Sequence, residues 1–289
     1  MSSRRTSLLT IIAVGCISYL LDPTPDRLPF LALAAAILGT ILLPRTKKER
    51  IAGILLCCAL LFFFIGPVLS SQFIEETLAG ITAEPMQHWP APAAQVGLGG
   101  QQITFRGDGR YYIATVCYWL NKHQALVAAH RIKEFSVGAS MPIQLVAEGL
   151  VEELSAEILF NDDNGVGIKL ADEPSSPWEQ LPIAGTSEII IGGEAEIISI
   201  HGGSFPVIVK GFLAMDSQQE KVVIERINDT DNFIGGMSGS PIVQNGKIIG
   251  FMSSTLRGMK GLAFGNVAAQ AYAQTEGLMQ EYAREKPQK

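Results

Sequence analysis

The residues from 235 to 254, GGMSGSPIVQNGKIIGFMSS, place a serine in the middle of a glycine-rich turn. Glycine tolerates backbone conformations that other residues avoid, and such a turn lets several backbone N–H groups point at one place. We therefore expect an exposed Ser238 hydroxyl, with the N–H groups of Gly236 and Ser238 aimed where a tetrahedral oxyanion would form. The alternative is an ordinary Gly/Ser-rich β-turn, ahead of the Asn-Gly hairpin that follows directly.

A serine hydroxyl is a weak nucleophile unless a base lies within hydrogen-bond reach. The chain has four histidines, of which His88 lies in a Pro/Gly-rich segment, and His123 and His201 lie in turns. His130 instead ends the strand-like run Ala-Leu-Val-Ala-Ala, which would place its imidazole at the mouth of a barrel. We take His130 as the candidate base, with a bystander surface histidine as the alternative.

The composition separates the chain into two parts. Of the 289 residues, 47% are hydrophobic, and the mean hydropathy of +0.25 is high enough to indicate a membrane part. Residues 1–70 hold 7 Lys/Arg against 3 Asp/Glu, whereas residues 71–289 hold 15 against 25. The acidic second part lacks the basic surface that nucleic-acid binding requires, so we expect no nucleic-acid partner.

Three of the four cysteines lie in the apolar N-terminal part, which leaves Cys117 alone in the remainder. The remainder therefore has no internal disulfide, and Cys117 is predicted to be a small buried side chain in a strand. No group of Cys and His residues has the spacing of a zinc site. We expect neither a metal nor another cofactor.

Three apolar segments, at about 7–21, 28–43 and 51–70, predict a membrane anchor of three transmembrane helices within residues 1–70. The third is long enough to cross a bilayer, while the first two are shorter than the roughly 20 residues needed, and a signal peptide is an alternative for the first. Basic residues at 4–5 and 45–50 should lie in the cytoplasm. Everything after residue 71 is then extracytoplasmic, and the protein is a multi-pass protein of the cell membrane.

Residues 71–100 are predicted to be a linker, since prolines and glycines interrupt the segment from 85 onward. From 101 to 289 we predict one β domain with a helix at about 267–284, and its many short strands favour a sandwich or a pair of barrels. The predicted strands are 101–106, 110–119, 125–129, 142–147, 150–159, 165–170, 187–191, 194–201, 205–214, 221–227, 240–244, 247–253 and 262–266.

The stretch TVCYWLNKHQALVAAH, residues 115–130, resembles the strand–turn–strand–Ala-Ala-His unit of chymotrypsin-like proteases. The resemblance implies an all-β fold, a chymotrypsin-like double β-barrel with a C-terminal helix, here preceded by an N-terminal transmembrane helical region. In that class an aspartate opens a strand of the form D-x-x-L-x-K-L. The matching run here begins with Asn164, and Asp163 lies one residue earlier, where a strand would point it to the opposite face.

The blocks GEAEIISIHGGSFPVIVKG (193–211), IERINDT (224–230) and GGMSGSPIVQNGKIIG (235–250) are similar to the SpoIVB, sporulation stage IV B, serine peptidase family. In that family the catalytic acid lies in a V-T-D-P type segment upstream of the serine. The resemblance therefore implies Asp229 as the acid, with Asp163 as second choice and Asp231 as third.

These observations predict a membrane-anchored extracytoplasmic serine endopeptidase that acts on a protein or peptide substrate. The resemblance further implies a signalling protease that cleaves a membrane-associated regulator during sporulation. The family usually has one membrane span and a PDZ domain, whereas this chain has three predicted spans and no room for a PDZ domain. The alternative is a catalytically inactive protease-fold domain that binds a peptide or protein partner.

Overall fold

The computed structural model describes residues 75, 77–107, 109–128, 132, 135–147, 149–162, 165–175, 178–199, 203–216, 219–228, 233, 236–255 and 261–285. The chain divides into two compact units, Met1–Ala79 and Gly80–Lys289. The three predicted membrane segments, at 7–21, 28–43 and 51–70, lie outside the described residues. Among the residues that are described, no helix combines the length and the hydropathy that a bilayer crossing requires.

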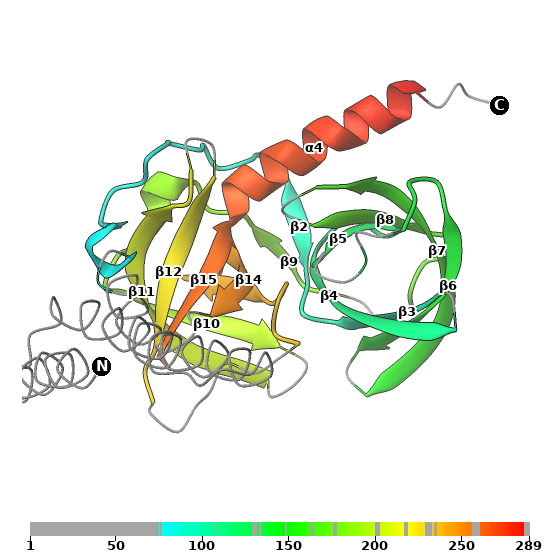
Figure 1. Cartoon of the computed structure of the whole chain (residues 1–289), viewed down its shortest axis with the longest axis horizontal. Coiled ribbons are helices and arrows are strands. Elements are labelled where there is room, and N and C mark those ends of the chain that lie inside the picture. The colour runs from blue at the N-terminus through cyan, green and yellow to red at the C-terminus, as the bar shows by residue number, and fades with distance from the viewer. Residues whose placement is uncertain are drawn as a thin grey trace, which may run out of the picture. The chain divides into compact units, whose positions relative to one another are not determined.

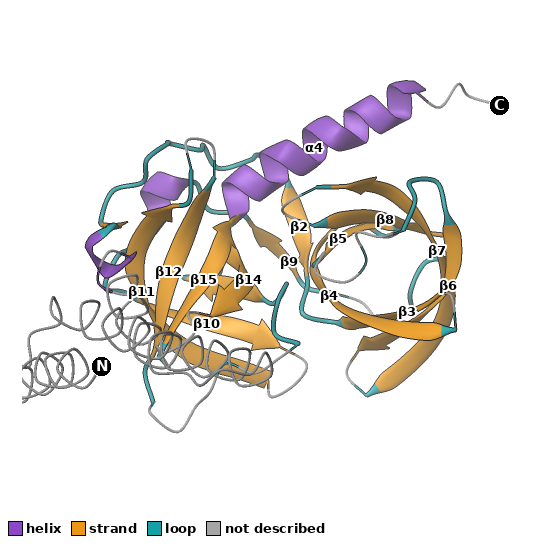
Figure 2. Ribbon diagram, viewed as in Figure 1, coloured by secondary structure: helices purple, strands orange, loops and turns teal. Residues whose placement is uncertain are grey.

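The first barrel is built by strands from the N-terminal half of the second unit (Figures 1 and 2). In the described part of the chain its strands lie in the order β3-β6-β7-β8-β5-β4-β2-β9, and β3 also pairs with β4, which closes a barrel of six strands. Their bounds are β2 (Gln95–Leu98), β3 (Gln102–Gly107), β4 (Arg110–Asn121), β5 (Gln124–Val127), β6 (Ser140–Ala147), β7 (Leu150–Asn161), β8 (Val166–Leu170) and β9 (Gln180–Pro182). The interior is filled by alternate residues of these strands, among them Ile103, Phe105, Val116, Trp119, Val127, Ile143, Ile158 and Ile168.

The second barrel follows the same plan. Its strands lie in the order β1-β11-β10-β13-β14-β15-β12, and a pairing of β11 with β12 again closes six strands. Their bounds are β1 (Ile81–Thr82), β10 (Glu194–Ser199), β11 (Gly203–Ala214), β12 (Glu220–Arg226), β13 (Pro241–Gln244), β14 (Lys247–Thr255) and β15 (Leu262–Val267). Its core includes Ile197, Val207, Phe212, Val222, Ile224, Met237, Ile242, Ile249 and Val267.

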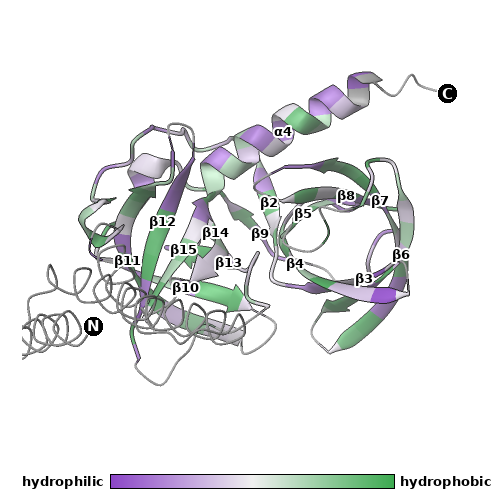
Figure 3. Ribbon diagram, viewed as in Figure 1, coloured by the Kyte–Doolittle hydropathy of each residue, from purple (hydrophilic) through white to green (hydrophobic). Residues whose placement is uncertain are grey.

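Helix α4 (Ala268–Glu285) follows β15 and contacts both barrels. Figure 3 shows apolar and polar residues alternating along it, as expected for a helix with one buried side. Beneath it the Tyr118 ring of β4 stacks on the Phe251 ring of β14, with centroids 5.1 Å apart, and the Tyr282 hydroxyl donates to Glu157 Oε1 of β7 at 2.6 Å. The helix therefore helps to seal the contact between the two barrels.

The prediction of an all-β double barrel with a C-terminal helix is confirmed by this strand order. One predicted strand, 187–191, is wrong: residues Thr186–Glu188 form a short 3₁₀ helix, η2. Three short strands, β1, β2 and β9, were not predicted, and the first two lie in the segment expected to be a linker. They form because each extends an existing sheet edge: β1 pairs with β11, and β2 pairs with both β4 and β9.

Candidate active site

Ser238 lies in a turn between β12 and β13, and the glycines on either side shape that turn. Gly236 has φ of 98° and Gly239 has φ of 96°, which are values that side-chain-bearing residues rarely adopt. These two conformations reverse the chain on both sides of the serine. They explain why the sequence needs glycine at both positions.

The turn is anchored in its own barrel. Met237, next to the serine, is 1% exposed and belongs to the core of the second barrel. The Gly239 amide donates to the Met252 carbonyl at 2.6 Å, and the Ser240 amide donates to the Met237 carbonyl at 2.9 Å. The backbone around Ser238 is therefore fixed on both sides, which is the pre-organisation that a nucleophile requires.

The Ser238 side chain is half-buried, and its hydroxyl donates to the Ser253 carbonyl of β14 at 3.3 Å. This distance is long for an O–H···O hydrogen bond, which is usually near 2.7–2.8 Å, so the bond is weak. The hydroxyl can therefore exchange this acceptor for a stronger one at little cost.

Two amides of the turn have no backbone acceptor among the residues that the structure describes. Gly239 and Ser240 use their N–H groups within the barrel, as described above. Within the described part of the chain, the amides of Gly236 and Ser238 donate to no backbone carbonyl. These are the two donors that the sequence suggests for an oxyanion.

The turn also rests against the first barrel, through a residue that sequence reasoning missed. Thr115 of β4 is 2% exposed, and its hydroxyl donates to the Gly236 carbonyl at 2.8 Å. A Cβ placed on Gly239 would lie 2.7 Å from the Thr115 carbonyl oxygen and 2.9 Å from the Ala128 Cβ. Ala128 in turn donates its amide to the Thr115 carbonyl at 2.9 Å, just beyond the end of β5. The turn at residues 236–240, called the nucleophile turn below, is thus in direct contact with the end of β5.

The other predicted site residues, His130, Asp163, Asp229 and Asp231, lie outside the described residues. Their roles, and the separation of about 4 Å that we expect between His130 Nε2 and Ser238 Oγ, stay predictions.

Cys117, on β4, is a second potential nucleophile, but its environment makes it unreactive. The residue is buried, and desolvation, together with the negative charge of Asp162, raises the pKa of its thiol far above the usual range. Because only the thiolate is strongly nucleophilic, Cys117 is a packing residue, as its sequence context predicted.

A model of the SpoIVB peptidase S55 family matches residues 113–262, just over half of the chain. No curated protein sequence is significantly similar. Among solved structures, the active form of the Rv3671c protease from M. tuberculosis shares 13% sequence identity with a TM-score of 0.48, over 62% of this chain and 79% of that chain. The serine endoprotease from Yersinia pestis shares 16% identity with a TM-score of 0.46, over 64% of each chain. The range matched by the family model contains Ser238 and every other predicted catalytic residue.

Proposed function

Because this chain belongs to the SpoIVB peptidase S55 family, a family of serine endopeptidases, we propose that it cleaves proteins outside the cytoplasm while residues 1–70 hold it in a membrane. Ser238 attacks the carbonyl carbon of the scissile peptide bond, and His130 accepts the hydroxyl proton. His130 then gives that proton to the leaving amine, and water hydrolyses the acyl-enzyme by the same route. Asp229 orients the imidazole, with Asp163 as the second candidate.

The contact between the nucleophile turn and the end of β5 carries this proposal. Ala128 touches the turn beside Gly239, and His130 follows Ala128 by two residues. Two residues of extended chain span at most about 7 Å, and this short separation supports His130 as the base that pairs with Ser238. The weak bond from Ser238 to the Ser253 carbonyl is then exchanged for one to His130.

The transition state is stabilised by the amides of Gly236 and Ser238, which donate to no backbone carbonyl of the described residues. Negative charge develops on the substrate carbonyl oxygen as Ser238 attacks, and the N–H groups of Gly236 and Ser238 are the donors proposed to bind it. The loss of one such donor typically lowers kcat by about 10²–10³-fold.

A fluorophosphonate probe tests the catalytic assignment directly, because only an activated serine reacts with it. We expect the full chain to be labelled at Ser238, with labelling abolished in Ser238→Ala and slowed by about 10³-fold or more in His130→Ala. Peptide mapping identifies the labelled residue. A wild-type chain that is properly folded but is not labelled would refute the proposed peptidase activity.

The membrane topology rests on the distribution of positive charge. Basic residues at 4–5 and 45–50 should remain in the cytoplasm, so three crossings leave the peptidase domain outside. The test is a reporter that is active only in the cytoplasm, fused after Lys289. We expect this fusion to be inactive, and the same reporter fused after residue 48 to be active; activity of the first fusion would overturn the extracytoplasmic location.

We further propose that the substrate is a membrane-associated regulator, so that the enzyme acts in signalling. Confinement of enzyme and substrate to one membrane raises their effective concentration, which favours a tethered substrate over a soluble one. Cells that carry Ser238→Ala should retain intact the extracytoplasmic segment of a membrane protein that wild-type cells release. Mass spectrometry of new N-termini in the two cell types identifies the substrate, and identical sets of N-termini would contradict the signalling role.

A further inference from the structure

Strand β4 presents a row of side chains that leads from the nucleophile turn to the tip of the first barrel. Alternate residues of a strand point to the same face, so Tyr111, Ile113 and Thr115 lie on one side of β4. Thr115 is buried because the nucleophile turn covers it, whereas Tyr111 is 65% exposed and Ile113 is 55% exposed. The solvent-exposed surface formed by Tyr111 and Ile113 is therefore continuous with the nucleophile turn.

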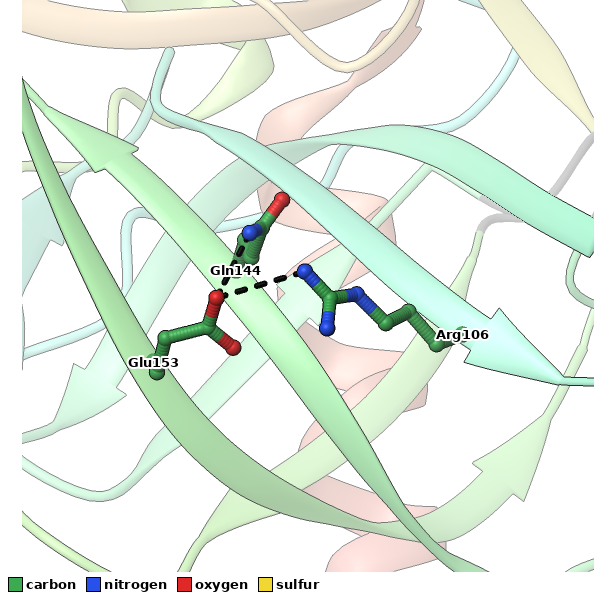
Figure 4. Close-up of polar contacts among 3 residues, drawn as sticks. All are labelled: Arg106, Gln144 and Glu153. Atoms are coloured by element: carbon green, nitrogen blue, oxygen red, sulfur yellow. Dashed lines mark hydrogen bonds and ion pairs between the residues drawn. The ribbon is translucent and has the colours of Figure 1, made fainter.

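Arg106, which lies beside the exposed tyrosine, belongs to a small polar network with Gln144 and Glu153 (Figure 4). The Arg106 guanidinium lies 5.6 Å from the centre of the Tyr111 ring. Glu153 accepts hydrogen bonds from Arg106 Nη2 at 3.3 Å and from Gln144 Nε2 at 2.6 Å. Exposed ion pairs add little to stability. The network places a guanidinium beside the exposed aromatic ring of Tyr111.

The dimensions of the row match an extended peptide. A strand rises about 3.3 Å per residue, so Ile113 lies about 7 Å and Tyr111 about 13 Å along β4 from Thr115. Thr115 itself touches Gly236 and Gly239, the residues that flank Ser238. A substrate in extended conformation has the same rise. A substrate that lies along β4 would therefore place its residues two to four positions away from the scissile bond beside Ile113 and Tyr111.

The chemistry of the reaction decides which side of the scissile bond lies there. The leaving amine must receive a proton from His130, so the C-terminal part of the substrate leaves on the side of the histidine. His130 follows β5, and β5 pairs with β4 through Val127 and Val116. With the role proposed for His130, this pairing favours the leaving-group side of the site for the row on β4.

We infer that Ile113 and Tyr111 bind apolar side chains of the substrate at the second to fourth positions after the scissile bond. This inference rests on the proposed catalytic roles of Ser238 and His130. At the far end of the row, a hollow of about 290 Å³ is lined by Arg106, Gly107, Gly109, Arg110 and Tyr111. It offers room for one large side chain next to the tyrosine ring.

The test compares the double variant Tyr111→Ser/Ile113→Ser with the control Val151→Ser, all in the full chain. Val151 is 60% exposed on β7 of the same barrel, and β3 and β6 separate β7 from β4. Each protein is assayed for fluorophosphonate labelling and for cleavage of reduced, alkylated casein. The residues that follow each cleavage site are identified by mass spectrometry in a mixed peptide library.

We expect the double variant to be labelled at the wild-type rate, because the small probe does not reach β4. Its casein cleavage should fall about tenfold, and the wild-type preference for apolar residues at the second to fourth positions should disappear. Val151→Ser should match the wild type in all three assays. Normal labelling with an unchanged cleavage preference in the double variant, or an equal loss in Val151→Ser, overturns this inference alone. Absence of labelling in the wild type refutes the proposed peptidase activity instead.

Discussion

Substitution of Gly239 by alanine should separate the nucleophile turn from the first barrel. The new Cβ would lie 2.9 Å from the Ala128 Cβ, whereas two carbon atoms normally approach to about 3.5–4.0 Å, so the turn must move by roughly 0.6–1 Å. A displacement of about 1 Å at a catalytic site can lower the rate by about 10²-fold. We therefore expect Gly239→Ala to be labelled by a fluorophosphonate about 100-fold more slowly than the wild type.

Gly246→Ala is the matched control for backbone strain. Gly246 also has a positive φ, 71°, but a Cβ added there would meet no atom within 4 Å. Both variants should lose about 1–3 kcal/mol of stability from an unfavourable φ. Only Gly239→Ala also carries the overpacking cost of about 1–3 kcal/mol, because only that side chain meets the neighbouring barrel.

The assay measures the labelling rate and the melting temperature of each variant. For a domain of 150–250 residues, 1 kcal/mol corresponds to about 2–4 °C in Tm. Gly246→Ala should melt several degrees lower than the wild type and react at the wild-type rate, while Gly239→Ala should melt lower still and react slowly. If Gly239→Ala reacts as fast as Gly246→Ala, then the contact with Thr115 and Ala128 does not position the serine, and our reasoning about the two barrels is wrong.

Two further predictions concern carboxylates. If Asp229 orients His130, Asp229→Asn should lower kcat by about 10³–10⁴-fold with little change in Tm, and Asp163→Asn should leave kcat nearly unchanged. The reverse result would assign the acid to Asp163. If neither substitution lowers kcat, the site works as a Ser-His dyad. Glu220 is 2% exposed, and desolvation raises its pKa even though its carboxylate accepts a hydrogen bond from the Met86 amide. The folded state therefore binds this proton more tightly than the unfolded chain, so the ionised carboxylate destabilises the fold at neutral pH. Glu220→Gln should raise Tm at pH 7, and this gain should vanish below the ordinary Glu pKa of 4.5. A gain that is independent of pH would contradict the desolvation argument.

Local patterns in the sequence predict most of the strands. In β4, for example, Tyr112 and Ala114 alternate with Tyr111 and Ile113, and the structure places the first pair inward and the second outward. This works because strand periodicity depends only on neighbouring residues and on which face is buried. The short strands β1, β2 and β9 have too few residues to show a period, and they exist only because a longer strand offers them an edge.

The incorrect prediction of a strand at 187–191 has a specific physical cause. The run Ile189-Ile190-Ile191 has strong β-propensity, but its backbone pairs with none of the strands that the structure describes. Instead the side-chain amide of Gln244 both accepts from the Ile190 N–H at 2.8 Å and donates to the Ile190 carbonyl at 3.0 Å. A side chain 54 residues away thus satisfies the groups that a strand partner would satisfy, and no local pattern reveals this.

The candidate site also contains some residues that the sequence predicts and others that it does not. The turn around Ser238 could be predicted from the sequence, because the positive φ at Gly236 and Gly239 favours glycine. Thr115 could not be found from sequence, since threonine is ordinary in a strand and its partner, Gly236, is 121 residues away. The acid could not be fixed either, because the choice between Asp229 and Asp163 depends on which carboxylate faces the imidazole in three dimensions.

The two barrels make different contributions to the position of the nucleophile. Its own barrel fixes the backbone of the turn, through the buried Met237 side chain and the bond from the Gly239 amide to Met252. The first barrel orients the turn through Thr115 and Ala128. This contact involves few atoms and lies at the edge of the apolar surface that joins the barrels. A small change in how the barrels dock would move Ser238 relative to His130 while leaving both hydrophobic cores intact. Peptidase activity should therefore be more sensitive than thermal stability to any change at the contact between the barrels.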